Sequence, residues 1–155
     1  MKILAENKKA YYNYEILEKL DAGISLLGQE VKSLKERGIN LAGSYVVLKQ
    51  STEGRHTEVF WIGAKIFPYQ PRNIGASYNP ERSRKLLLKK SEIKYLIGKS
   101  RQKSLTLVPL KLYTKNGKIK LEFAIAKGKK KFDKRELIKK RAVEKEIQRE
   151  LKIRG

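Results

Sequence analysis

The sequence predicts a mainly β protein, built as a small antiparallel barrel and followed by a basic C-terminal tail. Apolar and charged residues alternate over several short segments, as they do in half-buried strands. An Asn-Gly pair at 116–117 separates the two longest of these segments. The density of positive charge rises sharply toward the C-terminus, which places a boundary at 127–128. The oligonucleotide-binding barrel is one candidate, because periodicity alone does not separate it from other small barrels.

The first predicted strands are short, and they lack the strand–helix–strand alternation of a parallel sheet. They are 11–17, 24–27, 45–49, 59–66 and 85–88. A chain of 155 residues without internal repeats favours one domain, long enough to bury a core.

Two helices are predicted among these strands. In 27–38 three apolar residues fall at i, i+4 and i+7, and Gly38 suits the position just after the helix. The apolar residues are Leu27, Val31 and Leu34. The second helix lies in 91–103, with Ser91 as its expected N-cap. The segment 67–83 holds three of the four prolines and is predicted to be a loop.

A long hairpin is predicted around Asn116-Gly117, because both residues accept the positive φ of a type I′ turn. Its second arm, 118–126, alternates apolar with charged residues. Its first arm contains Pro109, which cannot donate to a strand ladder. That arm is therefore expected to lie at a sheet edge or to carry a bulge at Pro109.

The net charge of +21 predicts a polyanionic partner. This charge is more than solubility requires, and it opposes compactness through self-repulsion. Nucleic acid is the first candidate and an anionic membrane surface is the second. The start of the chain does not resemble a signal peptide, and no stretch approaches the ~18 apolar residues of a membrane span. A cytoplasmic protein without a membrane partner is therefore expected.

The sequence offers little for catalysis. Cysteine is absent, which excludes disulfides, thiolate metal sites and a cysteine nucleophile. His56 is the only histidine and lies in a hydrophilic turn, and the carboxylates form no D-x-D or E-x-x-H pattern. We expect no enzymatic activity, no metal site and no cofactor.

Two basic segments favour nucleic-acid binding, because Lys and Arg neutralise phosphates while aromatic rings stack on bases. The segment 7–14 joins lysines to three tyrosines, and 80–90 is rich in arginine and lysine. The residues concerned are Tyr11, Tyr12 and Tyr14 in the first segment, and Arg82, Arg84, Lys85, Lys89 and Lys90 in the second. The alternative for the tyrosines is that they pack, half-buried, on the barrel.

The tail carries 13 Lys/Arg and 5 Asp/Glu in residues 127–155, whereas the first 126 residues carry 24 and 11. Charge alone fits a solubility tail, a nucleic-acid arm or a segment that folds on its partner. On a helical wheel four apolar residues fall within one 120° arc, at ~100° per residue. They are Leu137, Val143, Ile147 and Leu151. We favour a segment that is disordered when free and helical on a polyanion, the alternative being a helix docked on the barrel.

Short motifs spread over nearly the whole chain resemble the SsrA-binding protein family, also called small protein B. They are "NKKA" (7–10), "AG" (22–23), "EVKSL" (30–34), "SYV" (44–46), "RKLLL" (84–88), "LIGK" (96–99), "LTLVPLKLY" (105–113), "AKGKK" (126–130) and "DKR" (133–135). Each motif is weak by itself, but their order makes the set specific.

The resemblance implies an oligonucleotide-binding-type antiparallel β-barrel of six to seven strands with two or three embedded helices. It divides the chain into an RNA-binding barrel domain, 1–127, and a basic tail, 128–155. It implies a non-enzymatic factor of trans-translation, expected to be a monomer. Such a factor binds the tRNA-like domain of transfer-messenger RNA and brings it to stalled ribosomes, where the nascent peptide is tagged for degradation. The tRNA-delivering elongation factor and alanyl-tRNA synthetase would be indirect partners.

The resemblance also implies which residues of the barrel bind RNA. Asp21, Leu87 and Lys89 match family positions for RNA binding, although relatives often carry Glu at the first and Asn or His at the third. Together with the motifs and basic segments, the expected set is Asn7, Lys8, Lys9, Asp21, Gly23, Glu30, Lys32, Ser33, Arg82, Arg84, Lys85, Leu87 and Lys89.

In the tail, the resemblance implies contact with the vacant decoding centre of the small ribosomal subunit and with its empty message channel. Phe132 occupies a position where relatives carry His or Tyr. The expected tail residues are Gly128, Lys129, Lys130, Lys131, Phe132, Asp133, Lys134 and Arg135. A ribosomal protein and a nuclease are the competing interpretations of the whole chain.

Overall fold

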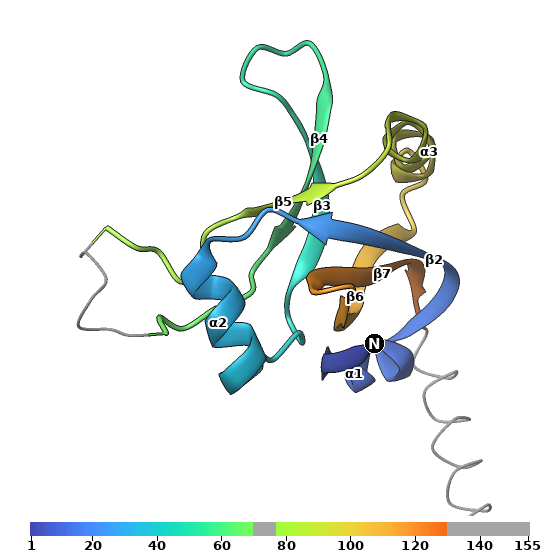
Figure 1. Ribbon diagram of the computed structural model, residues 1–155. Helices are drawn as coiled ribbons and strands as arrows, with labels where there is room; N and C mark the ends of the chain where they lie inside the picture. The colour runs from blue at the N-terminus through green and yellow to red at the C-terminus, as the bar shows by residue number, and fades with distance from the viewer. Residues whose placement is uncertain (70–76, 130–155) are drawn as a thin grey trace, which may run out of the picture.

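A computed structural model describes residues 1–69 and 77–129, which form seven strands and three helices (Figure 1). In chain order the elements are β1 (Lys2–Glu6), α1 (Lys8–Asn13), β2 (Tyr14–Ile24), α2 (Gly28–Arg37), β3 (Tyr45–Gln50), β4 (Thr57–Ile62), β5 (Arg84–Leu87), α3 (Lys90–Ser100), β6 (Leu105–Lys115) and β7 (Lys118–Gly128). The mainly β prediction is confirmed.

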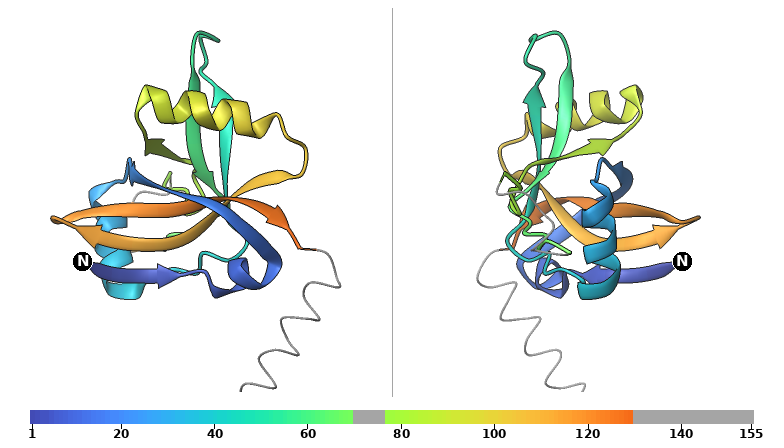
Figure 2. Two further views of the ribbon diagram at one scale, coloured as in Figure 1. Left: turned by 90° about the vertical axis from the view of Figure 1, so that its right-hand side faces the viewer. Right: turned by 60° about the vertical axis from the view of Figure 1, so that its left-hand side comes forward.

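The strands form one antiparallel sheet in the order β1-β6-β3-β4-β5-β2-β7, and β7 also pairs with β6. Six strands therefore make a closed circuit of pairings, with β1 added beside β6. The pairing between β3 and β6 is the shortest in this circuit, since it consists of the single residue pair Val46↔Leu107. The β3–β4 hairpin extends beyond the rest of the molecule, while α3 and α1 lie on opposite sides of the β6–β7 hairpin (Figure 2).

The core lies inside this circuit and contains side chains from all its strands. Trp61 and Phe123 are its largest apolar members, and both are fully buried. The indole Nε1 of Trp61 donates to Ser44 Oγ at 3.1 Å, so burying the ring leaves no unpaired donor. A second cluster packs α1 against β6 and β7 through Ala10 and Leu110.

The predicted β6–β7 hairpin is confirmed. Asn116 has φ of 51° and Gly117 has φ of 75°, and Lys115 pairs directly with Lys118 across the turn. The register shifts between Pro109 and Lys111, so the expected bulge is present at the proline. Pro109 pairs with β7, whereas β1 pairs with β6 only from Lys111 to Thr114 and β3 only at Leu107, so among the described residues no strand pairs with the proline on its other side.

Two of the remaining predicted strands match closely and three are displaced. The segments 45–49 and 85–88 correspond to β3 and β5. The prediction of 59–66 is wrong at its C-terminal end, because β4 stops before Gly63, whose φ is 76°. The prediction of 24–27 is wrong beyond Ile24, since the Leu27 N–H donates to the Glu30 carboxylate and starts α2.

The N-terminal region was predicted least well. Residues 11–13 end the helix α1 rather than start a strand, and β1 and α1 themselves were not predicted. The Oδ1 of Asn7 accepts from the Ala10 N–H at 3.3 Å and caps the helix. Burial of Ala10 then fixes the helix against the sheet, and this tertiary contact outweighs the β propensity of the tyrosines.

The helix predictions are confirmed, with one correction. α2 ends as expected, with Gly38 at φ of 70° and its N–H donating to Leu34 O at 3.2 Å. The N-cap of α3 is Lys89 rather than Ser91, because Glu92 Oε1 accepts from the Lys89 N–H at 3.0 Å. The described parts of the predicted loop 67–83 contain no helix or strand.

The predicted boundary at 127–128 falls within the last residues of β7. Pairing continues to Gly128, which lies opposite Tyr14 in β2. The Lys129 N–H then donates to Asn13 O at 2.9 Å. Residues 130–155, and with them most of the predicted tail, lie outside the described residues.

Candidate nucleic-acid interface

A groove of about 980 Å³ runs between β5, the start of α3 and the neighbouring edge of β2. It is lined by Asp21, Gly23, His56, Thr57, Glu58, Val59, Lys85, Leu86, Leu87, Leu88, Lys89, Lys90, Glu92, Ile93, Lys94, Ile97 and Lys120. Five residues predicted to bind RNA are among them: Asp21, Gly23, Lys85, Leu87 and Lys89. The chain thus brings residues that are far apart in sequence to one surface.

Leu87 forms an exposed apolar platform in this groove. Its residue surface is 56% exposed, although it belongs to a strand whose neighbouring Leu86 is buried. Gly23 pairs with Leu87 across the β2–β5 ladder, and a Cβ on Gly23 would lie 3.4 Å from Leu87 Cβ. A Cβ at this distance would make an ordinary van der Waals contact, so Gly23 and Leu87 lie directly side by side. The exposed leucine side chain offers an apolar face to a base or a ribose.

Lysines surround the platform. Lys85, Lys89, Lys90, Lys94 and Lys120 line the groove against the carboxylates of Asp21, Glu58 and Glu92. The Lys85 Nζ lies 3.9 Å from Glu58 Oε2, and this is the only ion pair that the lining lysines form in the described residues. A partly exposed pair of this length contributes little, so the lysines remain available to phosphates.

The carboxylate of Asp21 is held by a buried tyrosine. The Tyr113 hydroxyl donates to Asp21 Oδ1 at 2.9 Å, and Tyr113 is only 7% exposed. Burial, followed by the hydrogen bond to Asp21 and the nearby negative charge, raises the pKa of Tyr113 to about 12. The hydroxyl therefore stays protonated and donating. A fixed carboxylate repels phosphate but accepts hydrogen bonds from a base or a ribose hydroxyl.

Behind the groove, Glu30 forms the centre of a buried ionic cluster. Its Oε2 accepts from Arg84 Nη2 at 2.7 Å and from Arg84 Nε at 2.9 Å. Arg82 also binds this carboxylate, its Nε lying 3.2 Å from Oε2. The Tyr78 hydroxyl donates to the same oxygen at 3.2 Å. Arg84 is fully buried and donates further to Ala64 O at 2.7 Å, so its charge is paired and its donors are used.

The cluster keeps Glu30 ionised. Burial acts to raise the pKa of the Glu30 carboxyl. Hydrogen bonds from the two arginines and from the Leu27 backbone, with the charge of Arg84, outweigh burial and hold that pKa below its ordinary value.

For four residues, the prediction of direct RNA contact needs correction. The side chains of Asn7, Glu30, Ser33 and Arg84 are buried and already bonded within the protein. Asn7 Nδ2 donates to Pro109 O at 2.9 Å, and Ser33 Oγ donates to Phe67 O at 2.7 Å. Asn7 thereby holds α1 in place, Ser33 holds the segment that follows β4, and Glu30 with Arg84 holds β5. The structure thus gives these four side chains internal partners and leaves them little exposed surface.

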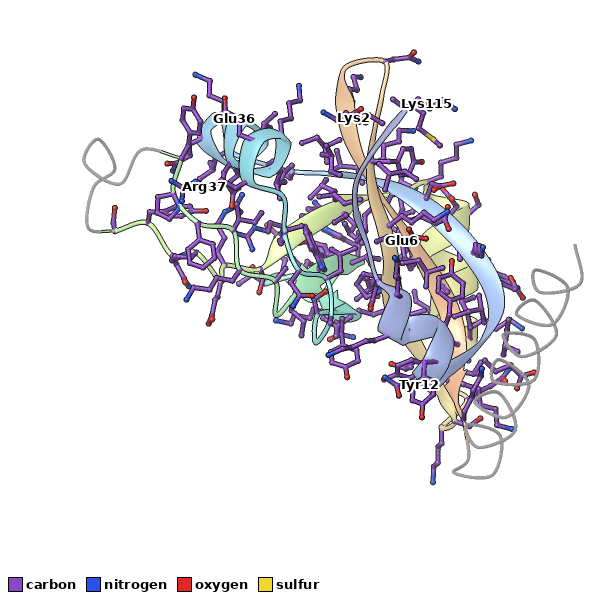
Figure 3. The ribbon with its side chains drawn as sticks, turned by 90° about the horizontal axis from the view of Figure 1, so that it is seen from below. Lys2, Glu6, Tyr12, Glu36, Arg37 and Lys115 are labelled. Atoms are coloured by element: carbon purple, nitrogen blue, oxygen red, sulfur yellow. The ribbon has the colours of Figure 1, made fainter. Side chains whose placement is uncertain are left out.

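The other predicted residues lie outside the groove. Lys8 and Lys9 are exposed on α1, and Lys32 is exposed on α2 with its Nζ 5.9 Å from the Tyr69 ring centroid. Arg82 keeps 30% of its side chain exposed while it pairs with Glu30. Figure 3 shows α1, with Tyr12, at one end of the molecule.

The tyrosines of the first basic segment are half-buried, which agrees with the packing alternative. The hydroxyls of Tyr14 and Tyr45 lie 3.5 Å apart, and Lys19 Nζ lies 5.7 Å from the Tyr11 ring centroid. In the predicted tail, Gly128 belongs to β7 and Lys129 Nζ donates to Tyr11 O at 3.0 Å. The remaining tail residues, Lys130 to Arg135, lie outside the described residues.

Residues 1–69 and 77–129 contain no group of three or more His, Cys, Asp or Glu that could hold a metal ion. None of the helices in these ranges is long and apolar enough to cross a membrane. His56 is exposed, with Nε2 3.2 Å from Glu58 Oε1.

Lys94, Tyr113 and Lys120 are among the interface residues that were not predicted. The period-two pattern of 118–126 already placed Lys120 on the outward face, so its exposure could have been inferred. Its position beside Gly23 depends on the pairing of β2 with β7. The contact between Tyr113 and Asp21 joins residues 92 positions apart, and no local pattern indicates it.

The chain is similar to known proteins along nearly its whole length. The family described as SmpB protein matches residues 4–153. The SsrA-binding protein of Syntrophobacter fumaroxidans (strain DSM 10017 / MPOB) is 50% identical over 151 residues, which cover 96% of this chain and 88% of the relative. That of Thermosipho africanus (strain TCF52B) is 47% identical over 153 residues, 98% of each chain. A solved structure described as "tmRNA-SmpB: a journey to the center of the bacterial ribosome" matches with a TM-score of 0.64 and 41% identity, covering 82% of this chain and 85% of that one.

Proposed function

This chain belongs to the SmpB protein family, and we propose that it is an RNA-binding factor of trans-translation. It binds the tRNA-like domain of transfer-messenger RNA and brings that RNA to stalled ribosomes, so that the nascent peptide is tagged for degradation. It acts in the cytoplasm as a monomeric binding factor without catalytic activity. The elongation factor that delivers tRNA and alanyl-tRNA synthetase reach the complex through the RNA.

The observation that carries this proposal is the convergence of Asp21, Gly23, Lys85, Leu87 and Lys89 on one groove. These residues come from β2, β5 and the turn before α3, and a polyanionic ligand is expected from the net charge of +21. Their chemistry is complementary to folded RNA, which presents phosphates, ribose hydroxyls and unstacked bases together.

Each part of the groove has a separate role in binding. The lysines neutralise phosphates and supply affinity, which carries little sequence information. Leu87 packs against an apolar face of the RNA, and Asp21 accepts a hydrogen bond from a base or a ribose hydroxyl. Because Asp21 is acidic, it disfavours any pose that places a phosphate at that point, and it thereby selects the orientation of the RNA.

The basic tail, 128–155, serves the ribosome rather than the initial RNA complex. Its charge suits ribosomal RNA, and Asp133, Lys134 and Arg135 match the family motif for the vacant decoding centre. We assign to the tail the probing of that centre and of the empty message channel. Gly128 still pairs as part of β7, and Lys129 binds α1. A truncation that removes the tail without disturbing the barrel therefore begins after Lys129.

The groove is tested by measuring the affinity of purified protein for the tRNA-like domain of transfer-messenger RNA. The variant Lys85→Gln/Lys89→Gln should bind on the order of tenfold more weakly, with the log–log salt slope reduced by about two. The control Lys65→Gln/Lys103→Gln removes the same charge from exposed residues outside the groove and should bind as the wild type does. Equal binding of the wild type to an unrelated RNA hairpin of the same length would contradict the proposed specificity.

The tail is tested by deleting 130–155. The shortened protein should retain its affinity for the tRNA-like domain within a few-fold, and it should fail to support tagging in a reconstituted assay with stalled ribosomes. Normal tagging by the shortened protein would refute the role given to the tail, while leaving the role of the groove intact.

A further inference from the structure

A second hollow, of about 470 Å³, lies beside the groove at the free end of the β6–β7 hairpin. It is lined by Met1, Ile3, Asp21, Lys111, Tyr113, Lys115, Asn116 and Glu122. These residues share the outward face of the sheet: Ile3 pairs with Tyr113, Tyr113 pairs with Lys120, and Asp21 pairs with Glu122. Neither the sequence motifs nor the family resemblance assigns this hollow.

Asp21 lines both hollows, so they adjoin at this residue. Lys120 lines the groove and lies next to Tyr113 of the second hollow in the β6–β7 ladder. A ligand strand that leaves the groove over Asp21 therefore passes directly onto this face of the sheet.

The second hollow is lined by two lysines and two carboxylates, and its lysines form no ion pair within the described residues. Within the described residues, no ion pair joins Lys111, Lys115 or Lys120 to a carboxylate, although Glu122 is a cross-strand neighbour of Lys111. Lys2 adds a further positive charge, because it pairs with Thr114 and lies at the same end of the molecule as Lys115 (Figure 3). Free lysines at a hairpin end are suited to a phosphodiester backbone.

We propose that the RNA bound in the groove continues across Asp21 into this second hollow, where Lys111 and Lys115 hold phosphates of the same RNA. The inference rests on the proposed RNA-binding function and extends the interface from β5 and α3 to the β1–β6–β7 sheet. Four residues of strand separate the two lysines by roughly 13 Å, so they bind different phosphates.

The other residues of the hollow favour RNA over a small anion. The carboxylates of Asp21 and Glu122 would repel a compact polyanion centred in the hollow, but they accept hydrogen bonds from ribose 2′-hydroxyls. Met1 and Ile3 are exposed apolar residues on the rim, at 88% and 46%, and they provide surface for sugar or base edges. An extended RNA backbone can satisfy all three kinds of residue: its phosphates bind the lysines, its ribose hydroxyls donate to the carboxylates, and its sugars or bases contact the apolar residues.

The experiment compares salt-dependent binding of the tRNA-like domain of transfer-messenger RNA by the full chain and its variants. Lys111→Gln/Lys115→Gln should weaken binding on the order of tenfold at low salt and lower the log–log salt slope by about two. The single variant Lys115→Gln removes an exposed side chain that the fold does not use, and it should lower the slope by about one. The matched control is again Lys65→Gln/Lys103→Gln.

The outcomes separate this inference from the proposed function. If the wild type and the groove lysines behave as expected, but both second-hollow variants match the control, the inference is overturned and the proposed function stands. If the wild type fails to bind the RNA, both are overturned. A slope that falls for the second-hollow variants beyond the fall seen for the control supports the extended interface.

Discussion

Glu30→Gln tests the claim that the buried ionic cluster holds the proposed RNA-binding surface together. The substitution keeps the shape of the side chain and removes only its charge. In the wild type Glu30 pairs with fully buried Arg84 and with Arg82, and its Oε1 also accepts from the Leu27 N–H at 2.9 Å. The variant therefore leaves the guanidinium of Arg84 buried without a counter-ion, while two carbonyl oxygens still accept from it.

The expected cost follows from the burial of both partners. Breaking a buried pair by removing one charge destabilises a protein by about 3–5 kcal/mol, because the remaining charge is uncompensated. The amide oxygen of glutamine and the carbonyls of Ala64 and Pro80 still accept hydrogen bonds, so we expect a value near the lower limit, about 3 kcal/mol. For a chain of this size, that value lowers the melting temperature by roughly 6–12 °C.

Urea denaturation of wild type and variant at several pH values measures this effect. The folded state holds the pKa of Glu30 below its ordinary value of 4.5, so the charge stabilises the fold fully above that value. The stabilisation is lost as the pH falls through the lowered pKa. The difference between wild type and Glu30→Gln should thus be full at pH 7 and should shrink in acid.

A matched control is Glu92→Gln, which removes a carboxylate that accepts from the Lys89 N–H at the start of α3. This carboxylate belongs to a partly exposed residue, so its neutralisation should cost no more than about 1 kcal/mol. A cost below 1 kcal/mol for Glu30→Gln, or a cost that does not change between pH 7 and pH 3, would refute the idea of a charged buried centre.

Three further predictions concern the hairpin, α3 and the interface. Gly117→Ala should destabilise the fold by about 1–2 kcal/mol in urea denaturation, because φ of 75° is unfavourable for alanine, and a neutral result would contradict the type I′ turn. Gly98→Ala should raise stability by about 1 kcal/mol in the same assay, since nothing lies within 4 Å of the added Cβ and the residue is helical, whereas a loss would indicate an unseen clash. Tyr113→Phe should weaken binding of the tRNA-like domain and cost about 1 kcal/mol of stability. In an absorbance titration this variant should lack the tyrosine that ionises near pH 12. The stabilisation that the variant loses is full below the ordinary tyrosine pKa, and it should vanish as the pH rises through the raised pKa of about 12. Unchanged RNA affinity would show that Asp21 does not need the Tyr113 hydroxyl.

Local signals in the sequence were enough to predict part of the fold. The turn at Asn116-Gly117, the end of α2 at Gly38 and the bulge after Pro109 each follow from the conformational limits of one or two residues. The helix α1 has one local signal, the Asn7 cap, and its other contacts are distant: Asn7 also bonds to Pro109, 102 residues away, and Ala10 is buried against the sheet. Sequence propensity predicts local structure where one or two residues restrict the backbone conformation. It fails where a contact between residues distant in sequence determines the local structure.

The same distinction applies to the interface. Family motifs and basic composition predicted Asp21, Leu87 and Lys89, and all three line the groove. They did not indicate which basic residues point inward. Arg84 was predicted to bind RNA because it lies in a basic run, yet it is fully buried against Glu30, 54 residues earlier. Charge in a sequence indicates a polyanionic partner only for side chains that reach the surface.

The buried residues explain why some residues of the family motifs do not face the groove. Along β5, buried and exposed residues alternate: Arg84 and Leu86 face inward, and Lys85 and Leu87 face the groove. Since a strand has a period of two, fixing Arg84 on Glu30 also fixes which residues of β5 face outward. Ser33 of the same motif binds Phe67, at the start of the segment that leads to β5. The motif residues of α2 thus set the register and position of the strand that we propose contacts RNA. A change at Glu30 should therefore impair RNA binding through the orientation of Lys85 and Leu87, without any direct contact.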